Sequence, residues 1–218
     1  MLQNNLTYYL IGITGGSASG KSLLIQTLRE LFSEQELCII SQDDYYKTLE
    51  QQQTDEHGVH NFDLLESIDS ERMYSDLLKL AEGKEVVKKE YIFERTDKEA
   101  GNKVFKPAPV VIVEGLFVFA FPDISSLIDL SIFVDCDSDI RFERRLRRDV
   151  MERGIPQEKV LHQWKYHVIP AHKSFVKPYR NTADLVINNY NSMKKGVELL
   201  SNHITALLKK DSGAKSEE

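Results

Sequence analysis

The segment GITGGSASGKS at residues 12–22 constrains the fold more than any other part of the chain. Residues 15–22 match the pattern G-x-x-x-x-G-K-S, preceded by the apolar run YYLIGIT and followed by the helical pattern LLIQTLRELF. In this setting the backbone N–H groups of the loop and the helix N-terminus converge on phosphate oxygens. We therefore predict that a nucleotide is bound by these residues: Gly15, Gly16, Ser17, Ala18, Ser19, Gly20, Lys21 and Ser22. Lys21 is expected to reach the outer phosphates and Ser22 to bind magnesium.

Apolar runs alternate with helical patterns along the rest of the chain. Five runs are short, nearly continuous and rich in β-branched residues, as in strands that are buried on both faces: 8–14, 37–41, 110–114, 130–135 and 184–188. Helical patterns cover 21–33, 69–82, 138–153, 157–176 and 192–209. This alternation predicts an α/β fold with a five-stranded parallel sheet and helices on both faces.

The remaining segments modify this plan. EVVKKEYIFE (85–94) and NKVFKP (102–107) predict two exposed strands of an inserted hairpin, spanning about 85–107. We expect a single domain over 1–208 and a lid at about 141–165. The last ten residues, KKDSGAKSEE, offer almost no apolar surface, so 209–218 is predicted to be a disordered tail.

Composition excludes several classes of protein. With 41% hydrophobic residues the chain has no apolar run of the roughly 18 residues that a membrane span needs. A net charge of -6 argues against a nucleic-acid partner, because phosphate neutralisation needs an excess of Lys and Arg. No export signal is visible, and Cys38 and Cys136 have no ligand partner at metal spacing. We expect a cytoplasmic protein with reduced cysteines.

Two acidic residues follow predicted strands and should lie at the same sheet edge as Gly15. Glu114 ends the run VVIVE and is the candidate metal ligand, although it could be the first solvated residue after the strand. Asp43 follows LCIIS and is the candidate base for a substrate hydroxyl, with a helix cap or turn as the alternative. Asp44 is expected to point elsewhere.

Arginines are concentrated in one helical pattern. Arg141, Arg144, Arg145 and Arg148 fall at i, i+3, i+4 and i+7, and Arg153 follows. A solvated helix face would explain such a run. Phosphoryl transfer also uses arginines on a mobile lid to neutralise charge and exclude water, and we favour that interpretation. A GTPase switch is disfavoured, since NKVF at 102–105 lacks the acid that reads guanine.

The pieces GGSASGKS, SQDDYY, NFD, EYIFE, VIVEGLFVF, FVDCDSDIRFERRLRRDVMERG and ADLVI together resemble the uridine kinase family, also called uridine-cytidine kinases. The resemblance runs in order from about residue 10 to 190. It implies a P-loop kinase that uses Mg²⁺ to move the γ-phosphate of ATP or GTP to the 5′-hydroxyl of uridine or cytidine. It also implies a homotetramer. In this reading Asp43 is the base, Lys21 serves the phosphates, and Ser22 and Glu114 hold the metal.

The resemblance implies further site residues. Asp63 and Arg148 would hold the ribose, with Arg148 and Arg153 also catalytic, while Arg145 would serve the nucleotide and Gln163 the substrate. Tyr91, Phe93 and Thr96 would line the base pocket. Family members usually carry Y-D-F-x-x-H-x-R in the hairpin, whereas this chain has YIFERTDK, so Thr96 replaces the histidine that reads the base.

Other departures follow from the same comparison of motifs. The usual H-P-D after NFD is LLE, and the usual Arg after ERG is Ile155. Losing a hydrogen-bonding reader can relax or redirect specificity, so a kinase for another small hydroxyl acceptor stays open. A catalytically silent nucleotide-binding protein is the other alternative, but it should have lost Lys21, Asp43 or Glu114.

Two histidines precede the NFD segment. His57 and His60, in DEHGVHNFD, are interpreted as loop residues that could at most replace the missing base reader. Their H-x-x-H spacing with Asp55 and Asp63 could suggest a metal, but no helix or strand fixes the geometry, and we discount it.

Overall fold

The computed structural model describes residues 8–89 and 101–214. Its main sheet has five parallel strands in the order β2-β5-β1-β6-β7. The strands are β1 (Tyr9–Thr14), β2 (Leu37–Ser41), β5 (Val110–Glu114), β6 (Leu130–Asp135) and β7 (Leu185–Asn188). They correspond to the five predicted runs, and the predicted α/β fold class is confirmed.

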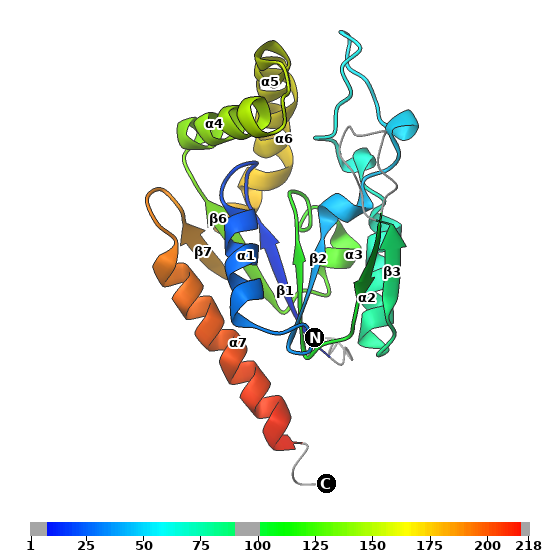
Figure 1. Ribbon diagram of the computed structural model, residues 1–218, viewed down its shortest axis with the longest axis vertical. Coiled ribbons are helices and arrows are strands. Elements are labelled where there is room, and N and C mark those ends of the chain that lie inside the picture. Colours follow the sequence, from blue (N-terminus) through cyan, green and yellow to red (C-terminus); the bar gives the residue numbers. More distant parts are fainter. Residues whose placement is uncertain (1–7, 90–100, 215–218) are drawn as a thin grey trace.

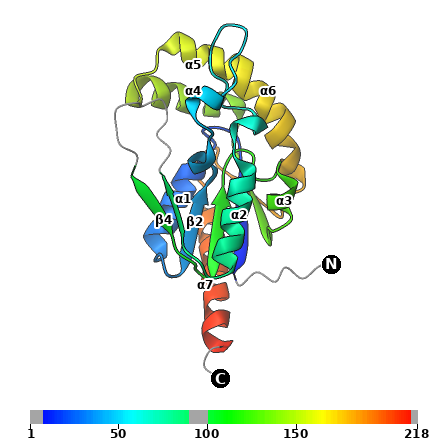
Figure 2. The ribbon, with the colours of Figure 1, turned by 90° about the vertical axis from the view of Figure 1, so that its right-hand side faces the viewer.

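Helices cover both faces of this sheet (Figures 1 and 2). The helices are α1 (Lys21–Leu31), α2 (Ser70–Ala81), α3 (Pro122–Ser125), α4 (Ser138–Arg147), α5 (Gln157–Gln163), α6 (Ile169–Ala171) and α7 (Lys194–Ala214). One apolar cluster joins α1 and α7 to the sheet, and the other joins α2 and α3 to it. Because strand side chains alternate between faces, Leu10 belongs to the α2 cluster and its neighbour Ile11 to the α1 cluster.

The helical segments from α4 to α6 cross the carboxyl edge of the sheet, where we predicted a lid (Figure 1), and "lid" denotes these segments below. They are not continuous α-helices as predicted, since π-helical turns occur at Arg148–Glu152, Trp164–Val168 and His172–Val176. Short 3₁₀ helices lie at Gln42–Tyr45, Leu49–Gln51, Leu65–Ser67 and Lys177–Asn181. The π-helical turns change which side chains share a face of these helices.

The predicted hairpin is present as an antiparallel pair, β3 (Val86–Lys89) and β4 (Asn102–Phe105). The prediction that both strands are exposed holds for one face only. Val87 and Val104 face solvent, whereas Val86 and Phe105 are buried in the α2 cluster. The reason is that side chains alternate between the two faces of a strand, and one face of the hairpin packs against the core. Residues 90–100, with Tyr91, Phe93 and Thr96, lie outside the described residues.

Helix α7 continues to Ala214, beyond residue 209, where we predicted a disordered tail to begin. Its apolar residues Leu200 and Ile204 are buried against the sheet, while its C-terminal part projects away from the body (Figure 2). Once a helix is nucleated by packing, each further turn costs little, so apolar content is a poor guide to its end. Among the described residues, no helix is both long and apolar enough to cross a bilayer.

Candidate active site

The glycine loop between β1 and α1 has the backbone geometry of a phosphate cradle. Gly20 has φ of 110°, in the region that favours glycine, and a Cβ there would meet the amide of Asn189. The Asn189 Nδ2 donates to the Ser19 carbonyl at 2.8 Å. The loop is therefore held from behind by the residue that follows β7, and its front is left for a ligand.

Lys21 lies over the loop. Its Nζ donates to the carbonyl oxygen of Gly15 at 2.7 Å and approaches that of Gly16 at 3.4 Å. Burial lowers the pKa of Lys21, and the nearby carboxylates of Glu114 and Asp43 oppose that shift. An ammonium group in this position is well placed for phosphate oxygens.

The ends of β2 and β5 bring the two predicted carboxylates to one place. Ser41 and Glu114 are partners in the strand register, and the Ser41 hydroxyl donates to Glu114 Oε1 at 2.6 Å. Asp43 follows in the first 3₁₀ helix, where its N–H donates to Ser41 Oγ at 3.3 Å. Asp44 turns away and pairs with Lys103 at 2.6 Å, as expected.

The two buried carboxylates at the ends of β2 and β5 create a local environment that favours a bound cation. Desolvation raises the pKa of Asp43 and the pKa of Glu114, and repulsion by Asp43 raises the latter further. Ser22 lines the same cavity as both carboxylates. A hydroxyl and carboxylate oxygens are the ligands that Mg²⁺ prefers. The residues present therefore fit the predicted magnesium site.

Gln42 was missed by the sequence analysis. Its side chain is fully buried, and its Oε1 accepts from the N–H of Phe117 at 2.7 Å. A Cβ at Gly115 would collide with Gln42, which explains the glycine after Glu114. Gln42 thus ties the segment carrying Asp43 to the segment after β5. A polar residue beside two acids gave no sequence signal of this role.

Of the four arginines predicted to share one helix face, Arg144, Arg145 and Arg148 line the cavity and Arg141 does not. Arg141 is buried, with its Nε donating to the Cys136 carbonyl and its guanidinium 5.6 Å from the Trp164 ring centroid. Arg145 also reaches the glycine loop, where it donates to Ser17 Oγ at 2.9 Å. The prediction treated every arginine as solvated or catalytic, whereas one of them is used to pack the lid helix.

Asp149 organises the arginines that do face the site. This buried carboxylate pairs with Arg148 Nε at 2.8 Å, Arg145 Nε at 3.2 Å and Arg153 at 3.2 Å. Asp149 was not among the site residues predicted from the sequence. Its position at the start of a π-helical turn, where side-chain faces change, explains why spacing did not identify it.

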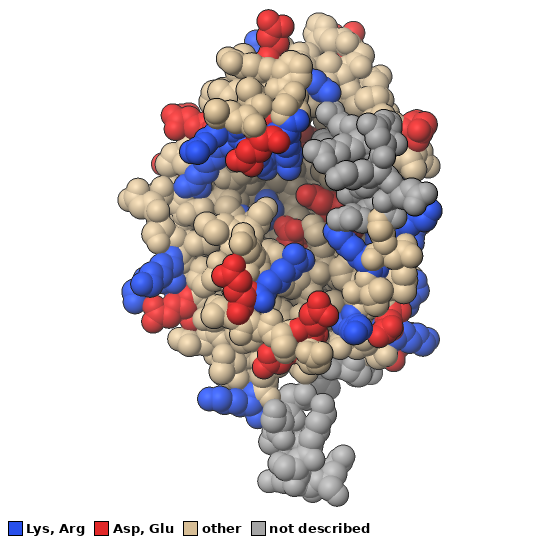
Figure 3. Space-filling model, in the orientation of Figure 1, with Lys and Arg blue, Asp and Glu red and all other residues tan. Residues whose placement is uncertain are grey.

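These residues surround one cavity of about 330 Å³ (Figure 3). Its wall includes most of the predicted site: Ser17, Ala18, Ser19, Gly20, Lys21, Ser22, Asp43, Asp63, Glu114, Arg145, Arg148, Arg153 and Gln163. Basic side chains predominate on the upper rim of the hollow, with an acidic group among them, and further acidic side chains lie below it. Ile155, where the family motif has Arg, also lines the wall. Gly15 and Gly16 contribute carbonyls to Lys21 instead.

Asp63 approaches the cavity from the loop before α2. Its backbone N–H donates to Asn61 Oδ1 at 3.0 Å, and the residue is 9% exposed. Burial raises the pKa of Asp63 while Arg145 opposes the shift. Tyr46 and Phe62 contribute aromatic side chains to the same wall. A buried acid beside aromatic rings can bind hydroxyl groups of a ring-containing ligand.

A glycine cradle, two carboxylates at strand ends and a lid of arginines together define a phosphotransferase of the P-loop class. Residues 10–195 match the model of the Phosphoribulokinase / Uridine kinase family, and the chain belongs to that family. The resemblance stated from the sequence is thereby confirmed. The chain is a kinase that phosphorylates a nucleoside or another small alcohol.

Individual relatives are similar over nearly the whole chain. A uridine kinase of Clostridium tetani is 33% identical over 201 residues, covering 92% of this chain and 96% of its own. Uridine-cytidine kinase-like 1 of Mus musculus is 35% identical over 202 residues, which are 92% of this chain and 37% of the mouse protein.

Solved structures share the fold at lower identity. Phosphoribulokinase from Rhodobacter spheroides has a TM-score of 0.58 at 16% identity, covering 84% of this chain and 70% of its own. D-glycerate 3-kinase from Cryptococcus neoformans has a TM-score of 0.55 at 16% identity, covering 83% and 86%. Kinases of different acceptors thus share this architecture.

Proposed function

We propose that the protein transfers the γ-phosphate of ATP or GTP to the 5′-hydroxyl of uridine or cytidine, as part of pyrimidine salvage in the cytoplasm. The observation that carries the proposal is the single cavity in which Asp43, Glu114 and the glycine loop meet Asp63 and the lid arginines. Relatives named uridine kinase at one-third identity support the choice of acceptor.

The donor side of the cavity is assigned to the glycine loop. The loop N–H groups and Lys21 would bind the β- and γ-phosphates, and Arg145 would approach them from the lid beside Ser17. Ser22 and Glu114 would hold Mg²⁺, which neutralises charge on the phosphates when bound. Arg148 and Arg153 would neutralise charge that develops on the transferred phosphoryl group.

The acceptor side is assigned to Asp43 and Asp63. Asp43 would accept the proton of the attacking hydroxyl, and the desolvation that raises its pKa makes it a stronger base than a solvated aspartate. Asp63, Arg148 and Gln163 would hold the ribose hydroxyls, and Tyr91, Phe93 and Thr96 the base. Closure of the lid excludes water, which would otherwise compete as the acceptor.

Two departures from the family motif favour a second candidate function, which is phosphorylation of a different small hydroxyl compound. Ile155 lines the cavity where the family motif has Arg, and Thr96 stands where the base-reading His is expected. A site that lacks a hydrogen-bonding reader discriminates less strongly for the group it would read.

The first experiment measures ADP production from ATP and Mg²⁺ with uridine, with cytidine and with no acceptor. Turnover with either pyrimidine nucleoside that disappears in Asp43→Asn would support the proposal. ATP binding without stimulation by either nucleoside would reject it and favour the second candidate. The homotetramer implied by the family resemblance is tested separately, by light scattering of the same preparation.

A further inference from the structure

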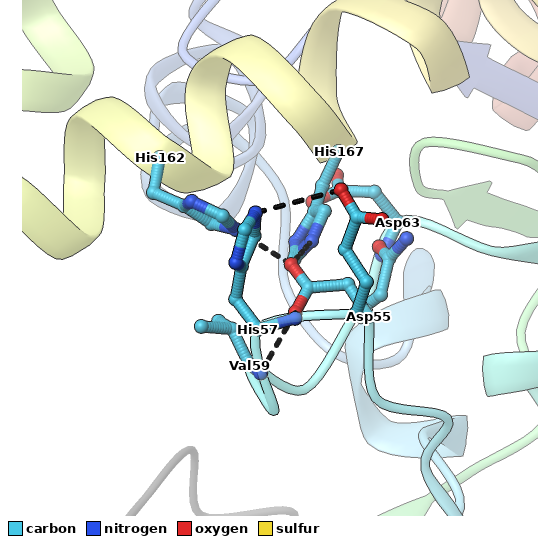
Figure 4. A network of polar contacts seen from close by, with 8 residues as sticks. Asp55, His57, Val59, Asp63, His162 and His167 are labelled. Atoms are coloured by element: carbon cyan, nitrogen blue, oxygen red, sulfur yellow. Dashed lines mark hydrogen bonds and ion pairs between the residues drawn. The ribbon is translucent and has the colours of Figure 1, made fainter.

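A cluster of histidines lies beside the active-site cavity, between the loop before Asp63 and the lid (Figure 4). The Oδ2 of Asp55 is 2.6 Å from Nε2 of His162 and 2.8 Å from Nε2 of His167. The three potential ligand atoms lie within 4.8 Å of one another. Neither histidine belongs to the H-x-x-H pair of His57 and His60, which we discounted as a metal site from the sequence.

The lid places the two histidines on one face by an unusual helical turn. They are separated by five positions, which puts side chains about 140° apart in a regular α-helix. His162 lies near the end of α5, and the π-helical turn Trp164–Val168 follows and contains His167. A π-helical turn brings residues i and i+5 together, and such turns occur frequently at functional sites. The π-helical turn thus changes the relative direction of the two side chains, and both rings point toward Asp55.

Hydrogen bonds within the loop occupy one carboxylate oxygen of Asp55 and leave the other facing the two histidines. Its other oxygen, Oδ1, accepts from the backbone N–H of His57 and of Val59, both at 2.9 Å. The Asp55 N–H in turn donates to the Val59 carbonyl at 2.9 Å. These bonds fix the carboxylate and leave Oδ2 pointing toward the lid (Figure 4). Hydrogen bonds of this kind to a ligating carboxylate orient it toward a metal.

We propose that Asp55, His162 and His167 form a binding site for a divalent transition metal, Zn²⁺ in the first place. Two imidazole nitrogens and one carboxylate oxygen are a ligand set of zinc enzymes and related centres, and they disfavour Mg²⁺ and Ca²⁺. Tetrahedral zinc ligands lie roughly 3.3 Å apart at ordinary bond lengths, so each side chain has to move by less than about 1 Å. Three protein ligands leave one coordination position for water.

The ion would fasten the loop at 53–60 to the lid. His167 is buried and His162 is half-buried, so the site is shielded on the lid side. Gln163, which follows His162, lines the active-site cavity, and Asp63 lies next to the cluster in Figure 4. The proposed metal site is separate from the magnesium site at Ser22 and Glu114, and it does not depend on the identity of the acceptor.

The test is metal binding by the full chain. The protein is stripped with a chelator, and Zn²⁺ is then titrated against a chromophoric competitor in excess Mg²⁺, which occupies oxygen-ligand sites. Co²⁺ titration provides a visible absorption spectrum that reports tetrahedral nitrogen and oxygen ligation. We expect one equivalent of either ion to bind to the wild-type chain.

Two conservative variants locate the ion. Asp55→Asn keeps the acceptor for the His57 and Val59 N–H groups, and His162→Gln changes a partly exposed ligand. Each should weaken Zn²⁺ binding at least about 10-fold. The matched control is His203→Gln, whose ring lies far along the chain in α7 against Tyr9, and it should bind Zn²⁺ as the wild type does.

Hydrogen exchange gives a readout that does not involve activity. Addition of Zn²⁺ should slow exchange at 53–60 and at 157–168 in the wild type, and this protection should be absent in Asp55→Asn. Absence of stoichiometric Zn²⁺ and Co²⁺ binding would overturn the proposal. Equal binding in wild type, Asp55→Asn and His162→Gln would overturn it as well, because the ion would then be held elsewhere.

Discussion

The phosphate cradle lines the active-site cavity and the Asp55 cluster lies beside it, and the two are built in different ways. The cradle is made by residues 15–22, which are contiguous, and its conformation follows from glycines between a strand and a helix. The Asp55 cluster joins residues that are 107 and 112 positions apart. A contiguous site can be predicted from local sequence, whereas a site closed across the fold needs the structure.

The largest effect is expected from replacing Asp43, the candidate base beside the phosphate cradle. Asp43→Asn should lower kcat by about 10²–10⁴-fold, because an amide cannot take the proton of the attacking hydroxyl. The melting temperature and the affinity for ADP should change little. Steady-state kinetics with the best acceptor and ADP titration measure these quantities.

The matched control for Asp43 is its neighbour. Asp44→Asn removes a carboxylate of the same 3₁₀ helix that faces Lys103 instead of the cavity. It should lower stability while leaving kcat within a few-fold of wild type. Equal losses of kcat in both variants would show that neutralising this helix disturbs the site generally, and the assignment of Asp43 as the base would fail.

The second prediction concerns Asp149, which connects the lid to the cradle through Arg145. Asp149→Asn leaves three guanidinium groups around a neutral amide, so the free energy of unfolding should fall by about 3–5 kcal/mol. Urea denaturation measures the loss. Asp139→Asn, an exposed acid of α4, is the control and should stay within about 0.5 kcal/mol of wild type. Similar losses in the two variants would contradict the role of Asp149.

The third prediction concerns His172, which lies behind the cradle. A Cβ at Gly16 would contact its ring, and Arg141 is close to the same glycine. Burial, aided by repulsion from Arg141 and Lys177, lowers the pKa of His172 from 6.5 to about 4. Between these values the unfolded chain binds a proton that the native state does not. Stability should therefore decline as the pH falls from 6.5 to 4, by about 1–2 kcal/mol once solvent screening of this half-buried ring is allowed for.

His172→Gln isolates this contribution. Urea denaturation at several pH values should show a shallower decline between pH 6.5 and 4 in the variant than in the wild type. His203→Gln serves as the control and should retain the wild-type slope. If His172→Gln also retains that slope, protonation of His172 is not the cause of the loss of stability between pH 6.5 and 4.

The sequence predicted the sheet, and the common location of the candidate site residues, for a shared reason. Strands buried on both faces have continuous apolar runs, and their carboxyl ends meet at one edge, so Asp43 and Glu114 could be placed beside Lys21. Periodicity also predicted the lid helices. It could not predict the π-helical turns, since those depend on packing and not on a repeat of the sequence.

The residues that sequence analysis missed share a property. Gln42 and Asn189 are buried polar side chains whose partners are backbone groups of distant segments. Such a bond contributes to stability only after both segments are in place, and neither residue type nor spacing indicates it. The carboxylate of Asp149 is a further case, because its three partners converge only around a π-helical turn.

The smallest expected effect sharpens the contrast between the cradle and the Asp55 cluster. In metal-free buffer His162→Gln should lower the free energy of unfolding by only about 1 kcal/mol, the net worth of one partly exposed hydrogen bond to Asp55. Its kcat should stay within about 3-fold of wild type, since neither His162 nor Asp55 is expected to touch the reacting groups.

The control for His162 is His57→Gln on the opposite side of the cluster. The His57 ring packs against that of His162 at 5.1 Å between centroids, but it is largely exposed. This variant should be still closer to wild type in both measurements. A loss of kcat in His162→Gln as large as that in Asp43→Asn would break the comparison, because the loop–lid contact would then govern the chemistry that we assign to the cradle side. A small loss leaves the cluster as an element that holds the cavity wall, and the chemistry with the residues at the strand ends.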